Sequence, residues 1–166
     1  DSIESGQEFG PDATTIQIKV NGQLESLSAE PRTTLASALR DHLDLTGTKV
    51  VCDRGSCSAC TVYLDGKPVN SCMISVFDVG DREITTIEGI AKNGALHPVQ
   101  EAFIEHDASQ CGYCTPGMIM SCVHLVDNNQ NPSLDDVKKA TRGNLCRCGT
   151  HPHVFKATLE ASKKLK

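Results

Sequence analysis

The chain has 166 residues, a formal net charge of −5, 39% hydrophobic residues and 4% aromatic residues. This length fits one domain or two small ones, and two units of roughly 75 residues would have small cores that gain from a metal or covalent link. The acidic balance argues against a nucleic-acid partner, because no basic run is present to neutralise phosphates. No stretch approaches the roughly 18 apolar residues that a membrane span requires.

The first segment, 1–13, is polar, contains glycine and has no apolar period. These features predict a flexible N-terminal arm. The chain begins at Asp1 rather than at methionine, and the initiator methionine normally stays in place before an aspartate. We therefore expect that a leader has been removed.

Two segments with alternating side chains follow the arm. TTIQIKV (14–20) and QLESLS (23–28) flank Asn21-Gly22, which is the strongest two-residue signal for a β-hairpin. A threonine at 33 or 34 can then cap a helix. The apolar stripe of that helix has the expected spacing and consists of Leu35, Ala38, Leu39 and Leu43.

Three more strand segments come after a cysteine-rich loop: TVYL (61–64), KPVNS (67–71) and EITTI (83–87). The first two are joined by Asp65-Gly66, a tight-turn signal. A hairpin, a helix, a loop, a strand pair and a closing strand together predict a β-grasp domain over 14–88.

From residue 89 onward the pattern becomes helical. GIAKNG (89–94) has the composition of a linker, and Ser133 can cap a helix whose first turn is acidic. Four segments show helical period: 98–106, 117–126, 133–140 and 154–165. We expect an α+β protein in which a β-grasp domain (14–88) precedes a four-helix bundle (89–166).

The nine cysteines are the most informative residues of the chain. An odd number excludes complete intramolecular disulfide pairing, which favours metal coordination. Eight of them divide evenly between the two predicted domains, and Cys122 is left on the apolar stripe of its helix as a small buried residue. The first set is Cys52, Cys57, Cys60 and Cys72, and the second set is Cys111, Cys114, Cys146 and Cys148.

The first set has the spacing C-x4-C-x2-C with a fourth cysteine after the strand turn, which is the plant-type 2Fe-2S pattern. Three thiolates must converge from one loop, so the intervening residues must turn their N–H groups toward the sulfurs. Gly55 permits the tight backbone, and the hydroxyls of Ser56 and Ser58 can add hydrogen bonds. Such donors favour the reduced cluster and raise its potential.

Other uses of these cysteines are less consistent with the spacing. Zinc accepts four thiolates, but a nine-residue loop with three ligands is unusual for it. A disulfide framework would need strained pairing between near neighbours, and a thioredoxin-type use of Cys57 and Cys60 lacks a βαβ setting. A zinc-stapled interaction module stays open as an alternative, which a red-brown colour would exclude.

Three segments together resemble the two-cluster iron–sulfur subunit of the molybdenum hydroxylases, the xanthine dehydrogenase and aldehyde oxidoreductase family: CDRGSCSACTVYLDGKPVNSC (52–72), QCGYCTPGMIMS (110–121) and GNLCRC (143–148). The likeness covers about residues 14–165. It implies that the first set holds one 2Fe-2S cluster and that the second set holds another. It also implies a large partner subunit with a molybdenum–pterin cofactor, approached by Gln110 and Cys148.

The chain departs from the common family pattern at two places. Relatives commonly have glycine where Ser56 and Ser58 stand, and C-R-C-T-G-Y where this chain has CRCGTHPH (146–153). The second variant resembles isoquinoline oxidoreductase and cytochrome-linked aldehyde dehydrogenases, which implies a cytochrome subunit as electron acceptor and no flavin subunit. An FAD subunit is the alternative acceptor. Eight cysteines already fill eight ligand places, so His151 and His153 are expected to begin a helix rather than to bind iron.

The sequence contains no nucleophile–base pair and no phosphate-binding loop, so we expect no bond chemistry in this chain alone. The resemblance implies an electron-transfer subunit that relays electrons one at a time from the molybdenum cofactor to an external acceptor. A free-standing ferredoxin-like carrier is the alternative, although a carrier needs neither the bundle nor Gln110. Export of a folded cluster protein would use the twin-arginine route, so a removed leader favours a periplasmic location over a cytoplasmic one.

Overall fold

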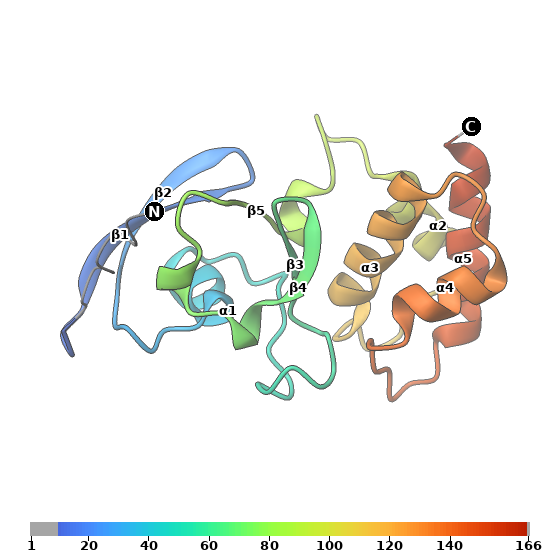
Figure 1. Ribbon diagram of the computed structural model, residues 1–166. Coiled ribbons are helices and arrows are strands. Elements are labelled where there is room, and N and C mark those ends of the chain that lie inside the picture. Colours follow the sequence, from blue (N-terminus) through green and yellow to red (C-terminus); the bar gives the residue numbers. More distant parts are fainter. Residues whose placement is uncertain (1–9, 166) are drawn as a thin grey trace, which may run out of the picture.

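The computed structural model describes residues 10–165, in which a mixed sheet precedes a group of helices (Figure 1). This order agrees with the predicted α+β organisation. Residues 1–9 of the arm predicted over 1–13 lie outside the described residues.

The first two strands form the predicted hairpin. Strand β1 (Thr14–Val20) pairs antiparallel with β2 (Gln23–Ala29), with Val20 opposite Gln23. Asn21 and Gly22 adopt φ angles of 52° and 79°, the left-handed conformation that a two-residue turn of this type requires. The inward side chains near the turn end of β1 are buried, and the outward ones are exposed.

The sheet has five strands in the order β2-β1-β5-β3-β4. Strands β3 (Thr61–Leu64) and β4 (Lys67–Asn70) form the second hairpin, and β5 (Glu83–Thr85) lies between β1 and β3. The β1–β5 pair is parallel and the other pairs are antiparallel. This is the β-grasp arrangement that the strand signals predicted.

The predicted helix after Thr34 is shorter and less regular than its apolar stripe suggested. Thr34 caps α1 (Leu35–Ser37) by accepting a hydrogen bond from the Ser37 N–H at 3.2 Å. The chain then widens into a π-type turn over Ala38–His42. Leu35 and Leu39 are still fully buried against the sheet core, so the stripe predicted the buried face but not the helix type.

All four predicted helices are present after residue 89. They are α2 (Pro98–Glu105), α3 (Thr115–Asn128), α4 (Leu134–Thr141) and α5 (His151–Lys164). Ser133 caps α4 as predicted, and its hydroxyl accepts from the Asp136 N–H at 3.2 Å. Helices α3 and α5 supply most of the buried apolar side chains of the bundle.

The sheet and the bundle meet where β3 lies against α3 (Figure 1). All four residues of β3 are buried, because one face of the strand meets the sheet core and the other meets the bundle. Tyr63 belongs to the bundle core, and its hydroxyl donates to the Met120 carbonyl oxygen at 2.5 Å. The core of the first half and the core of the bundle are otherwise separate, and the domain boundary near 89 stays a prediction.

Candidate metal centres

The first cysteine set occupies the loop between the π-type turn and β3, together with the turn after β4. Cys57, Cys60 and Cys72 are buried, with 8%, 3% and 7% of their surfaces exposed. Cys52 is half-buried. The chain reverses within the loop through left-handed residues, among them Asp53 at φ 50°. The loop therefore folds its three thiols toward the fourth.

The four thiols of this set come together as two pairs. The Cys52 thiol interacts with that of Cys57, and the Cys72 thiol interacts most strongly with that of Cys60. A hydrogen bond from the Arg54 N–H is the main cause that lowers the pKa of Cys52 to about 7. Burial raises the pKa of Cys72 to about 11.

Backbone amides point at these sulfurs, as the spacing predicted. The Gly55 N–H donates to the sulfur of Cys72, and the Ser56 N–H donates to that of Cys52, each at 3.3 Å. Gly55 has φ 71°, a backbone conformation that favours glycine. A Cβ on it would lie 2.9 Å from Cγ of Met73, whose exposed side chain can move aside.

The prediction that the Ser56 hydroxyl donates a hydrogen bond to a sulfur is wrong in this structure. Its hydroxyl donates to the Arg54 carbonyl oxygen at 3.5 Å rather than to a sulfur. The reason is local, because the amide of the same residue already faces Cys52. Ser58 has φ 54°, and its carbonyl oxygen, rather than its hydroxyl, accepts hydrogen bonds from neighbouring elements.

The second cysteine set lies at the N-terminal ends of two helices. Cys114 is the N-cap residue of α3, and Cys111 lies three residues before it. Cys146 and Cys148 lie in the segment that leads into α5, which begins at His151. Cys111 and Cys148 are exposed, and the other two are half-buried. Helix N-termini carry partial positive charge and free N–H groups, so this position stabilises thiolates.

These four thiols are also paired, Cys111 with Cys148 and Cys114 with Cys146. Burial acts to raise the pKa of Cys146, but hydrogen bonds from the hydroxyl and N–H of Thr150 outweigh it and lower that pKa to about 6. Burial raises the pKa of Cys114 to about 12. The Thr150 hydroxyl lies 3.0 Å from the Cys146 sulfur.

Both sets therefore offer two thiol pairs. Within residues 10–165, no three or more His, Cys, Asp or Glu side chains converge closely enough to hold a single metal ion. A 2Fe-2S cluster takes four cysteines, two on each iron. The donor type, the pairing and the amide hydrogen bonds fit such a cluster at each set.

Comparisons with known proteins agree with this geometry. The family described as a 2Fe-2S iron-sulfur cluster binding domain matches residues 18–86, and the family described as a [2Fe-2S] binding domain matches residues 86–159. A nicotinate dehydrogenase subunit of Pseudomonas putida is 45% identical over 90% of this chain and 96% of that relative. The chain belongs to the two-cluster iron–sulfur subunits of the molybdenum hydroxylase family.

Further relatives support the same assignment. The aldehyde oxidoreductase iron-sulfur-binding subunit of Escherichia coli K12 is 40% identical over 94% of this chain and 75% of that relative. The crystal structure of quinoline 2-oxidoreductase from Pseudomonas putida matches with a TM-score of 0.88 and 36% identity, over 92% of this chain and 95% of that chain. The β-grasp domain and helical bundle of this iron–sulfur subunit are thus those of its family.

This iron–sulfur subunit transfers electrons within an oxidoreductase complex, as its relatives do. The large subunits of those complexes carry the molybdenum cofactor. Among residues 10–165, none of the helices has the length and apolar character of a membrane-crossing segment.

Three other predicted residues have clear positions. Gln110 is exposed directly beside Cys111. His151 and His153 lie in the first turn of α5, as expected. Nε2 of His151 lies 3.0 Å from the Asn144 carbonyl oxygen, and Nδ1 of His153 lies 2.9 Å from the His106 carbonyl oxygen. These two rings therefore contact backbone oxygens.

The ninth cysteine is part of the bundle core. Cys122 is fully buried on α3, and burial raises the pKa of its thiol to about 12. A neutral, buried thiol of this kind is a small apolar residue. The residue that sequence analysis missed is Thr150, whose hydroxyl contacts the Cys146 sulfur and does not cap α5.

Proposed function

We propose that Cys52, Cys57, Cys60 and Cys72 hold one 2Fe-2S cluster, and that Cys111, Cys114, Cys146 and Cys148 hold a second. When bound, each cluster accepts and releases a single electron. The chain contributes paired thiolates, backbone N–H donors and helix N-termini, and it buries three of the four thiols of the first set. This ligand assignment rests on the two thiol pairs at each site.

One hydrogen bond supports a relay between the two sites. The Leu145 N–H donates to the Cys57 carbonyl oxygen at 3.1 Å. Leu145 precedes Cys146, so the bond joins a residue of the first set to the backbone beside a residue of the second. The two sets thus share a short connection through the chain, which separate carriers in two independent domains would not need.

The exposed face of the second set is proposed to receive the electrons. Cys111 and Cys148 are exposed there, and Tyr113 and Leu145 expose 54% and 60% of their surfaces. Gln110 adds an amide that can both donate to and accept from a pterin. We infer that the large molybdenum subunit covers this face and that the 52–60 loop delivers electrons to the acceptor, a cytochrome or an FAD subunit.

The substrate class is inferred from the relatives. Nicotinate dehydrogenase and quinoline 2-oxidoreductase are named for nitrogen-containing aromatic rings, and other relatives are aldehyde oxidoreductases. We propose that the assembled complex oxidises a substrate of one of these two classes. The pocket that selects between them belongs to the large subunit.

Iron and acid-labile sulfide assays test the ligand assignment. Two clusters require about four iron atoms and as many sulfide ions per chain. About half that iron, or stoichiometric zinc, would contradict the proposal.

The direction of transfer is tested with Cys148→Ser and Cys57→Ser in the assembled complex. The spin coupling between Mo(V) and the nearer reduced cluster should change in Cys148→Ser and persist in Cys57→Ser. The opposite result would reverse the proposed path.

A further inference from the structure

The 52–60 loop carries three cysteines of the first set, and the 143–148 segment carries two cysteines of the second. These two segments meet next to the first turn of α3. Gly117 lies in that turn, and a Cβ on it would lie 2.2 Å from the Ser58 carbonyl oxygen and 3.0 Å from that of Ala59. Both contacts are with backbone atoms of the 52–60 loop, so no side-chain rotation can relieve them. Any residue larger than glycine must move the loop away from α3.

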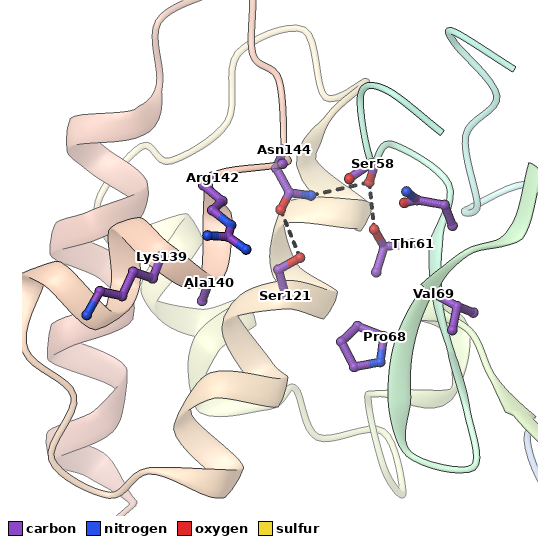
Figure 2. Close-up of a pocket in the computed structure, with 11 residues that line it drawn as sticks. Ser58, Thr61, Pro68, Val69, Ser121, Lys139, Ala140, Arg142 and Asn144 are labelled. Carbon is purple, nitrogen blue, oxygen red and sulfur yellow. Dashed lines mark hydrogen bonds between the residues drawn. The ribbon is translucent and has the colours of Figure 1, made fainter. Parts of the chain in front are cut away.

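Asn144 connects the 143–148 segment to the 52–60 loop and to α3, through the hydrogen bonds drawn in Figure 2. Its side chain donates to the Ser58 carbonyl oxygen at 3.2 Å and accepts from the Ser121 hydroxyl at 2.9 Å. Only 3% of the Asn144 surface is exposed. The next residue, Leu145, makes the hydrogen bond to Cys57.

These contacts converge on the short segment between two ligands of the first set. Ser58 lies between Cys57 and Cys60, and its carbonyl oxygen also accepts from the Thr61 hydroxyl at 2.8 Å. Asn144 lies two positions before Cys146, and Gly117 lies three positions after Cys114. A shift at this place therefore moves one ligand set relative to the other.

We propose that Gly117 and Asn144 are positioning residues that set the separation and orientation of the two clusters, an inference that rests on the proposed ligand assignment. Neither residue provides a ligand. Gly117 permits the close approach of the 52–60 loop to α3. Asn144 fixes the position of that loop by a buried hydrogen bond. Magnetic coupling and electron transfer between the clusters depend on this geometry, whereas the binding of each cluster does not.

The decisive variant is Gly117→Ala in the assembled complex. Alanine is the better helix former, so a loss cannot come from helix propensity. We expect unchanged iron and sulfide content, but a loss of the spin coupling between the two reduced clusters in electron paramagnetic resonance, together with slower turnover.

Gly143→Ala is the matched control. A Cβ at residue 143 would lie 3.1 Å from the Ser58 hydroxyl oxygen, a side-chain atom that can rotate away. Coupling should therefore stay at the wild-type level in this variant. A wild-type coupling in Gly117→Ala would overturn the inference.

A second pair of variants covers the case in which Gly117→Ala yields no assembled complex. Asn144→Ala leaves Ser58 bonded to Thr61, and it leaves the Ser121 hydroxyl bonded to the Gly117 carbonyl oxygen at 3.2 Å. No buried partner is stranded, so the variant should fold and show weakened coupling. Ser121→Ala keeps the bond from Asn144 to Ser58 and should retain full coupling.

The outcomes separate this inference from the proposed function. A wild-type chain without two clusters would defeat the ligand assignment itself. Two intact clusters with wild-type coupling in Gly117→Ala, or in Asn144→Ala where Gly117→Ala does not assemble, would leave the assignment standing and overturn only the positioning role.

Discussion

The two cysteine sets offer the same four-thiol chemistry in different surroundings. In the first set three thiols are buried, and Cys60 and Cys72 pack with Ala36 in a small core of their own. In the second set two thiols are exposed, and the other two only border the bundle core. The first site is thus enclosed by its own chain, whereas the second is built at the surface.

The sources of stabilisation differ in the same way. A loop with left-handed residues and inward amides forms the first site. The N-terminal ends of α3 and α5 form the second, where the helix dipoles favour negative charge. An exposed site on rigid helix ends suits the surface that we propose the large subunit covers.

The largest expected effect is the difference in the free energy of unfolding between Cys60→Ala and Cys111→Ala. Each change should remove one cluster and halve the iron content. Cys60→Ala should also lower the free energy of unfolding by several kcal/mol, because a metal site around which a loop folds contributes directly to folding. Cys111→Ala should cost much less, since the bundle core does not include that exposed residue.

Iron analysis and thermal unfolding, followed by circular dichroism, measure both effects. Equal losses of thermal stability in the two variants would refute the contrast between an enclosed site and a surface site.

A second prediction concerns the order in which iron is lost to a chelator. The isolated chain should lose the cluster of the second set first, because Cys111 and Cys148 are exposed. In the assembled complex this loss should slow markedly if the large subunit covers the same face. Electron paramagnetic resonance identifies which cluster remains, and earlier loss from the first set would contradict the burial argument.

Much of the fold could be predicted from sequence because local patterns determine it. Asn21-Gly22 specifies a hairpin, the alternation in 14–20 specifies a strand, and helical periods located all four helices of the bundle. The cysteine spacing indicated the cluster type and the division into two sets. The resemblance to a known family added the ligand assignment, which stays a proposal.

What could not be predicted depends on contacts between distant segments. The role of Gly117 follows from the backbone of Ser58, which is far away in sequence. The sequence predicts only that Tyr63 lies in a strand. In the structure its hydroxyl donates to the Met120 carbonyl oxygen across the sheet–bundle contact. The Ser56 hydroxyl was assigned to a sulfur, because spacing alone does not show which group of a residue faces inward.

The variant with the smallest expected effect tests whether α4 helps to position the residues of the second site. Ser133→Ala removes a cap in which the Ser133 hydroxyl accepts from the Asp136 N–H at 3.2 Å and donates to Oδ2 of Asp136 at 2.7 Å. The cost should be about 1 kcal/mol of unfolding free energy. Both clusters should keep their spectra, because the second set depends on the ends of α3 and α5 and not on α4.

Asp136 determines how the stability difference between wild type and Ser133→Ala depends on pH. Hydrogen bonds from the Ser133 hydroxyl and N–H lower the pKa of Asp136 below its ordinary value of 3.8. A carboxyl with a lowered pKa in the folded state stabilises the protein fully above the ordinary value and loses this contribution as the pH falls below it. The stability difference between wild type and Ser133→Ala should therefore be the same at pH 7 and pH 5. Hydrogen exchange of the α4 amides at both pH values measures it, and a difference that had already faded at pH 5 would contradict this account of the cap. Altered cluster spectra in the same variant would show that α4 does shape the second site.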